Sequence, residues 1–236
     1  MRPFWIGTAV LLLAAACGRS PAPHSGTPSG SASPAPIVAV NPANIKKVVR
    51  ELPPGYEVST GIPGAVSPRV MWGLAVDATA KPAQCGALAD PGPEPRDGRE
   101  GSAQGVSGSG SGGIINAVLV GFPAQPGPLH SDLALDRDAV AACGQWTMTA
   151  AHTTVSIRLI DPPHIDGTET LGMMVDIKTS VESGTEIDSR AYTFTAYLGD
   201  YYAFTTVTTD PGSVLPTLTP QFAADLLVKT VSTLRS

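Results

Sequence analysis

Charge is scarce in this chain, and basic residues are the minority. Only 15% of the 236 residues are charged, and 15 Lys and Arg stand against 20 Asp and Glu, for a formal net charge of −5 at pH 7. Nucleic-acid-binding proteins show a basic patch or stripe, so this balance argues against nucleic acid as a partner. It also offers no polybasic support for binding to an anionic membrane surface.

A membrane-spanning hydrophobic run is also missing at the N-terminus. The apolar segment from Phe4 to Leu13 is shorter than the roughly 20 residues that a spanning helix needs. Arg2 precedes it, and the three alanines at 14–16 follow it. A positive start, a short apolar centre and a small-residue cleavage region are the parts of a secretory signal peptide. We therefore predict a signal peptide over residues 1–16.

Cys17 directly follows this cleavage region. Small residues ahead of a cysteine resemble the lipobox of bacterial lipoproteins, although Ala14 stands where such boxes favour Leu. The resemblance implies an exported protein held on the outer face of the cell membrane by acyl chains such as palmitate on Cys17. The alternative is ordinary secretion with cleavage at the alanines, which leaves Cys17 free.

Cysteine is rare, and its count is odd. The chain has three: Cys17, Cys85 and Cys143. If Cys17 carries lipid, the other two are free to pair in an oxidising compartment, and we predict a Cys85–Cys143 disulfide. The alternative is two buried thiols. Neither cysteine has the CxxC spacing of redox or zinc motifs, and we predict neither a metal site nor a cofactor.

Residues 17–40 differ in composition from the rest of the chain. They are mostly Pro, Ala, Ser and Gly with almost no charge, a composition that cannot bury a core. We predict a disordered tether that spans about 25 Å as a flexible coil. Residues 41–236 are long enough for one domain with a sizeable core, and we predict a single extracytoplasmic domain there.

Local patterns predict several elements in the first half of this domain. A helix begins after Asn41, whose side chain can cap it, and ends at the Pro-Pro-Gly of residues 53–55. Cys85 lies in a short helical or turn segment. Extended segments are predicted over Tyr56–Ser59, Val70–Val76 and Ile114–Phe122.

The run Gly108–Gly113 is a literal GxGxxG. In a dinucleotide-binding site this motif follows a hydrophobic strand and opens a helix. Here a polar stretch from residue 90 precedes it and a predicted strand follows. We therefore interpret the run as a flexible surface loop and not as a nucleotide site.

Two acidic residues, Asp136 and Asp138, open a predicted helix that ends near Cys143. Carboxylates this close are candidate metal ligands. They are also what the first turn of a helix favours, because of capping and the helix dipole. We favour the capping interpretation.

The second half is rich in Thr, Val, Ile and aromatic residues, which favours strands. Gly199-Asp200 is typical of a two-residue type II′ hairpin turn, and Thr219-Pro220 begins a closing helix. Strands are predicted over Thr147–Ile160, Leu171–Val181, Arg190–Leu198 and Tyr201–Thr209. Serial hairpins with helices at both ends predict an α+β fold, an antiparallel β-sheet with flanking helices.

Aromatic residues concentrate in the last hairpin. Four tyrosines, Tyr192, Tyr197, Tyr201 and Tyr202, alternate there with Phe194 and Phe204. Exposed tyrosines along a sheet can line a groove for an apolar or glycan ligand of the envelope. The alternative is a sheet face packed on the closing helix, with cross-strand aromatic pairs stabilising the hairpin. The pair Tyr197 and Tyr201, or the pair Tyr192 and Tyr202, is the candidate exposed subset.

No catalytic constellation stands out. No pair of the four histidines, His24, His130, His152 and His164, has HExxH spacing, and GxSxG is absent. Asp161 and Asp166 flank His164, for which we favour a solvated loop over a site. We predict no catalytic residue.

Several of these features together resemble a known family. The Leu52-Pro-Pro-Gly-Tyr56 segment, Cys85, and Cys143-Gly-Gln-Trp146 before the hairpins resemble uncharacterised mycobacterial lipoproteins. These are similar to the extracellular sensor domain of a mycobacterial serine/threonine protein kinase. The resemblance, over residues 42–236, implies an antiparallel sheet flanked by helices and a ligand cleft. The kinase domain has two disulfides, whereas this chain can form one, and the family supplies no catalytic residues.

These observations favour a non-catalytic, lipid-anchored module of the cell envelope that binds a ligand or acts as a sensor. The alternative is an envelope scaffold that binds a protein partner and no small ligand. An envelope hydrolase is the third hypothesis. A deep apolar cleft bordered by exposed tyrosines favours the first of these, and a flat, filled sheet face favours the second. Ser, His and acidic side chains within hydrogen-bond reach of one another favour the third.

Overall fold

The computed structural model describes residues 39–62, 67–75, 77–92, 101–122, 133–210 and 214–236. The predicted signal peptide, Cys17 and the tether up to residue 38 lie outside the described residues, as do His24 and His130. The chain from Pro36 onward forms one compact unit. In the described part of the chain, no helix combines the length and the apolar character needed to cross a membrane.

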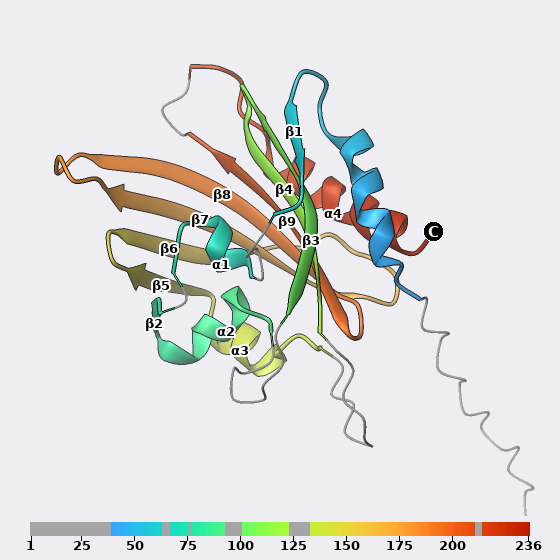
Figure 1. The fold of residues 1–236 in the computed structure, drawn as a ribbon. Coiled ribbons are helices and arrows are strands. Elements are labelled where there is room, and N and C mark those ends of the chain that lie inside the picture. Colours follow the sequence, from blue (N-terminus) through green and yellow to red (C-terminus); the bar gives the residue numbers. More distant parts are fainter. Residues whose placement is uncertain (1–38, 63–66, 76, 93–100, 123–132, 211–213) are drawn as a thin grey trace, which may run out of the picture. The chain divides into compact units, whose positions relative to one another are not determined.

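A nine-stranded antiparallel sheet runs through this unit, in the order β1-β3-β4-β9-β8-β7-β6-β5-β2 (Figure 1). The strands are β1 (Glu57–Thr60), β2 (Thr79–Lys81), β3 (Ser102–Gly110), β4 (Gly113–Gly121), β5 (Gln145–Ala150), β6 (Thr153–Ile160), β7 (Glu169–Ser180), β8 (Glu186–Tyr197) and β9 (Tyr201–Thr209). The helices are η1 (Pro42–Glu51), α1 (Pro68–Met71), η2 (Ala83–Cys85), α2 (Gly86–Ala89), α3 (Arg137–Ala142) and α4 (Pro220–Leu234). The predicted α+β class is confirmed.

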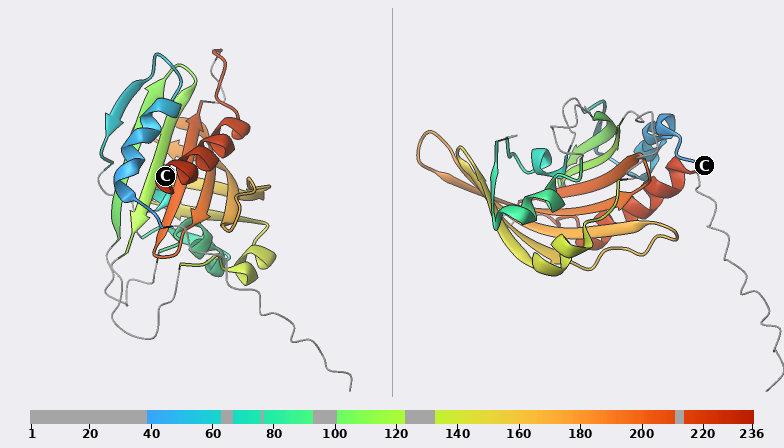
Figure 2. Two further views of the ribbon diagram at one scale, coloured as in Figure 1. Left: turned by 90° about the vertical axis from the view of Figure 1, so that its right-hand side faces the viewer. Right: turned by 90° about the horizontal axis from the view of Figure 1, so that it is seen from below.

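Helices cover both faces of the sheet. On one face, η1 and α4 lie together against β3, β4, β8 and β9 (Figure 2, left) and share a core that includes Phe194, Ala196 and Leu227. On the opposite face, the segments of α1, α2 and α3 pack through residues such as Trp72 and Leu88. Side chains alternate between the faces of a strand, so β8 contributes to both cores.

The strongest local signals in the sequence are confirmed. Asn41 accepts a hydrogen bond from the Ala43 amide at 3.1 Å and caps η1, which is a 3-10 helix. Thr219 Oγ1 accepts from the Phe222 amide at 3.2 Å and caps α4. Between β8 and β9, Gly199 has φ +73° and the Leu198 amide donates to the Tyr201 carbonyl at 2.8 Å, which fits the predicted type II′ turn.

Two predictions of extended structure are wrong in detail. The segment from Val70 is not a strand: α1 and a turn occupy it, and Trp72 is buried against the sheet. A short apolar run does not distinguish a strand from a buried turn. The predicted strand from 147 to 160 is two strands, β5 and β6, joined through Ala151 at φ +44°. No glycine or proline marks this break.

The glycine-rich run is a hairpin of the sheet and not a flexible loop. β3 ends at Gly110 and β4 begins at Gly113, whose φ is +129°. The Tyr56 ring packs on this hairpin so closely that a Cβ on Gly110 would lie 2.7 Å from it. The Tyr56 hydroxyl also accepts a hydrogen bond from the Gly112 amide at 3.1 Å. Close approach of an aromatic ring explains Gly110, whereas the positive φ and the neighbouring Thr208 carbonyl explain Gly113.

Candidate functional site

The predicted disulfide is present. Cys85 and Cys143 are both buried and bonded, with their Cα atoms 5.7 Å apart. The bridge joins the end of η2 to the residue that closes α3, and Trp146 follows at the start of β5. It therefore holds the α2 and α3 segments together over one face of the sheet.

Asp136 is a helix cap. Its Oδ1 accepts a hydrogen bond from the Ala139 amide at 2.8 Å, as predicted, and Asp138 lies in the first turn. Across the described ranges, no group of three or more His, Cys, Asp or Glu side chains is placed to hold a metal ion.

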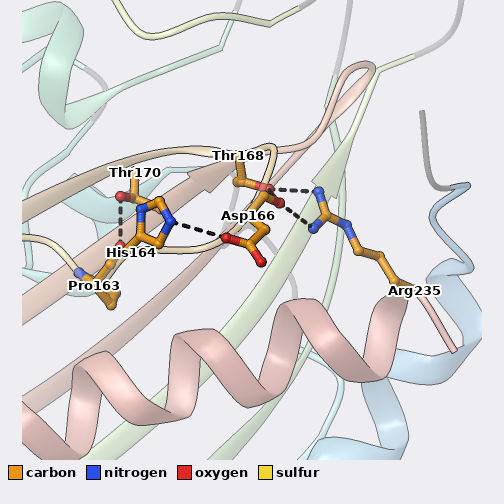
Figure 3. A network of polar contacts seen from close by, with 6 residues as sticks. All are labelled: Pro163, His164, Asp166, Thr168, Thr170 and Arg235. Atoms are coloured by element: carbon orange, nitrogen blue, oxygen red, sulfur yellow. Dashed lines mark hydrogen bonds and ion pairs between the residues drawn. The ribbon is translucent and has the colours of Figure 1, made fainter. Parts of the chain in front are cut away.

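The loop around His164 lies in solvent. His164 Nε2 is 3.1 Å from Asp166 Oδ1, and the two side chains are 89% and 101% exposed (Figure 3). Asp161, on the other side of His164, is also exposed. The Arg235 guanidinium donates to the Asp166 carbonyl at 3.2 Å and to Thr168 Oγ1 at 2.6 Å. This network ties the β6–β7 loop to the end of α4, which is a structural role.

The four tyrosines of the last hairpin divide between the two faces of the sheet. Tyr197 shares a face with Tyr202, and Tyr192 shares the other with Tyr201. The sequence prediction had paired Tyr197 with Tyr201 and Tyr192 with Tyr202. Tyr197 and Tyr202 are directly opposite each other and both are buried. Burial raises the pKa of both hydroxyls, and nearby carboxylates raise it further, so both tyrosines stay neutral at physiological pH. Tyr192 and Tyr201 are half-buried against the core under α4.

Of these four, Tyr192 lies in a hollow. A depression of about 470 Å³ is lined by Tyr192, Arg190, Thr209 and the segment from Leu215 to Pro220. The Arg190 guanidinium donates to Asp176 Oδ1 at 2.6 Å, and this hydrogen bond raises the pKa of Arg190. A ligand role for the tyrosines stays a prediction.

A larger groove lies where β9 ends, and sequence reasoning missed it. Its volume is about 700 Å³, and we call it the β8 groove. It is lined by Gly110, Gly113, Ile114, Glu186, Ile187, Asp188, Ser189, Thr208, Thr209 and Asp210. None of the four tyrosines is among these residues. Its sign in the sequence is Ile187, an isoleucine between the acidic residues Glu186 and Asp188, and the structure leaves this side chain exposed.

Unequal strand lengths form this groove. β8 has 12 residues and β9 has nine, and their pairing begins at Arg190 opposite Thr209. The β7–β8 hairpin therefore runs on past the end of β9 (Figure 1). On the other side of β9, β4 pairs with it from Ile114 opposite Thr208. The first four residues of β8 and the β3–β4 turn become the two walls.

The walls combine apolar and acidic character. Ile114 and Ile187 are 47% and 54% exposed. The described lining residues include three carboxylates and no Lys, Arg or His. Lys178, which lies opposite Asp188 on β7, places its Nζ 3.9 Å from Glu186 and 3.8 Å from Asp188, so one cation partly balances two of the carboxylates.

Comparisons with known proteins found a matching family and similar solved structures. The family described as a domain of unknown function, DUF5642, matches residues 41–235. No curated protein matches the chain. Similar solved structures include an uncharacterized protein from Mycobacterium smegmatis, an Rv0999 ortholog, at 19% identity and TM-score 0.57 over 84% of this chain and 98% of that chain. They also include the extracellular domain of PknH from Mycobacterium tuberculosis, at 13% identity and TM-score 0.41 over 83% and 93%. The predicted resemblance to an uncharacterised mycobacterial protein is thus found among solved structures, as a likeness of fold.

Proposed function

The chain belongs to the DUF5642 family of domains of unknown function, and we propose that it is a non-catalytic, extracytoplasmic domain that binds a ligand in the β8 groove. In this proposal, lipid on Cys17 anchors the protein to the outer face of the cell membrane. The alternative, ordinary secretion without lipid, leaves the binding role unchanged.

The exposed isoleucines of the groove support the binding role. Ile114 and Ile187 come from β4 and β8, on either side of the point where β9 ends, and the groove between these strands has a volume of about 700 Å³. Ligand sites commonly have volumes of about 300–1,000 Å³ and mostly apolar walls with a few polar groups. Covering apolar surface contributes about 25 cal/mol per Å² removed from water, so a ligand with an apolar part is stabilised here.

Three features support export. The N-terminal segment has the parts of a signal peptide, Cys17 follows its cleavage region, and Cys85 and Cys143 form a disulfide. Structural disulfides persist in oxidising compartments and are rare in the cytosol. The first two features come from the sequence, and the third comes from the folded domain.

The test is to purify the full chain in detergent from its own host and to record native mass spectra. We expect a bound species of defined mass, and amide hydrogen exchange should slow in residues 110–114 and 186–190 relative to stripped protein. Ile187→Glu should lose the bound species, whereas Val58→Glu, at an exposed position on β1, should keep it. Protein that carries no bound species, or one that protects neither segment, would contradict the proposal.

A second candidate is an envelope scaffold that binds a protein partner. This candidate is favoured because both faces of the β8–β9 hairpin are covered. Tyr197 and Tyr202 are buried on one face and Phe194 on the other. Cross-linking in intact cells separates the two. A protein cross-linked through surfaces away from the β8 groove, with no small bound species, would favour the scaffold.

A further inference from the structure

We propose that the occupant of the β8 groove is an extended peptide segment that alternates basic and apolar residues and adds to the sheet as a short strand beside the first residues of β8. This proposal rests on the proposed function, because it names the class of ligand that the groove binds. It follows from the pairing of the strands, the length of the open edge and the distribution of charge.

Among the residues that the structure describes, one edge of the first part of β8 has no strand partner. Residues 186–189 pair with β7, from Glu186 opposite Ser180 to Ser189 opposite Ile177. On their other side, the described residues provide no strand partner, because the pairing of β9 with β8 ends at Arg190 of β8. A strand edge presents a row of N–H and C=O groups to any chain that can pair with it, and addition of an extended peptide to such an edge is a known mode of recognition.

The open edge is long enough for a short strand. Beyond the end of β9 only the β3–β4 turn borders the groove on the side away from β8, because Gly113, the first residue of β4, is level with Thr209. The open edge of four residues is about 13 Å long. At the β3–β4 turn, Gly110 and Gly113 carry no side chain to narrow the entrance.

The side chains along the open edge alternate in character. Ile187 shares a face of the sheet with Ala191, which is opposite Thr208, and Thr208 is in turn opposite Ile114. On that face, a strand added beside residues 186–189 would place a side chain next to Ile187, and Ile114 lies nearby, level with Thr208 near the end of β9. Alternate residues of the added strand would therefore be apolar.

The other face is acidic. Glu186 and Asp188 alternate with Ile187, so they belong to the opposite face of β8, and their side chains are 62% and 63% exposed. Lys178 approaches them from β7, the side away from the open edge. Nearby, Arg190 is engaged by Asp176. Opposite charges on neighbouring strands stabilise a sheet and like charges destabilise it, so the intervening residues of the peptide should be Lys or Arg.

The test screens a synthetic pentapeptide library against the full chain in detergent micelles. We expect enrichment of Lys or Arg at alternate positions and of aliphatic residues between them. The best binder, followed by fluorescence anisotropy, should slow amide hydrogen exchange at residues 186–189. Methylation of the backbone nitrogens along one edge of the peptide should weaken binding at least tenfold, because those amides pair with β8.

Charge variants give a second measurement. The double variant Glu186→Gln and Asp188→Asn should weaken the basic peptide about tenfold, and the surface variant Glu57→Gln on β1 should not. A library without alternating enrichment, or N-methylated peptides that bind equally well, would overturn strand addition. If strand addition fails but a species from the host still protects the groove from hydrogen exchange, the proposed function stands. If that species is also absent, both proposals are contradicted. Self-association of the chain with protection of residues 186–189 would replace the peptide by a second copy.

Discussion

The indole nitrogen of Trp72 donates a hydrogen bond to Thr193 Oγ1 at 3.0 Å, and both groups are buried. Thr193 Oγ1 is also 3.0 Å from Thr206 Oγ1 on β9. This contact joins the segment after α1 to the middle of the sheet. Two residues further along β8, Thr195 is equally buried, and its hydroxyl has no hydrogen-bond partner among the described residues.

These two threonines give a matched pair of variants. Thr193→Val leaves a buried indole N–H unsatisfied, which costs about 1–3 kcal/mol, so the free energy of unfolding should fall by that amount. Thr195→Val removes a buried hydroxyl that makes no hydrogen bond, and it should leave stability unchanged or raise it. Urea unfolding of both variants checks the pair. Equal losses would show that the hydrogen bond of Trp72 contributes nothing specific.

Removal of the disulfide should destabilise the domain. Cys85→Ser opens a loop that spans a sequence separation of 58, and the chain-entropy treatment gives a loss of about 4 kcal/mol for a loop of this size. Thermal unfolding should show the loss, and a reducing agent should produce a similar shift in the unaltered protein. An unchanged melting temperature, with both thiols open to alkylation in the native protein, would reject a structural role for the bridge.

Cys17→Ser tests the anchor separately from the fold. If lipid on Cys17 holds the protein, the variant should move from the membrane fraction to the soluble fraction in the host. The folded domain should be unaffected, because Cys17 precedes the compact unit that begins at Pro36. A Cys17→Ser variant that still needs detergent for release from the membrane would contradict the lipid anchor. Cys85→Ser, which keeps Cys17, is the control for a nonspecific effect of losing a cysteine.

Short-range signals predicted much of the fold. The turn at Gly199-Asp200 and the cap at Thr219 depend on a few neighbouring residues, so the last hairpin and α4 could be predicted from sequence. The division between β5 and β6 could not, because Ala151 adopts a left-handed conformation that non-glycine residues rarely take. α1 was missed because it is a single turn that depends on distant contacts: Trp72, which follows it, is buried and donates a hydrogen bond to Thr193 of β8.

The candidate site was less predictable than the fold. Alternation along β8 predicted which residues share a face, but not that both faces are covered. One face is covered by η1 and α4, and the other by segments that the Cys85–Cys143 bridge holds. The β8 groove depends on β9 ending before β8 and on β4 lying beside β9. These are long-range pairings. The sequence prediction also began the strand at Arg190, which omitted the four residues that form one wall.

The glycine-rich hairpin provides a prediction that separates its two interpretations. A Cβ on Gly110 would lie 2.7 Å from the ring of Tyr56, so Gly110→Ala should force the ring to shift and lower the free energy of unfolding by about 1–3 kcal/mol. Gly144→Ala is the control, since no atom lies within 4 Å of the added Cβ. Urea unfolding measures both. A flexible surface loop would tolerate either change, so equal stability of the two variants would contradict the packed hairpin. If Gly110→Ala is destabilised, the same substitution should cost little when it is made in a Tyr56→Ala variant, because the clash is then absent.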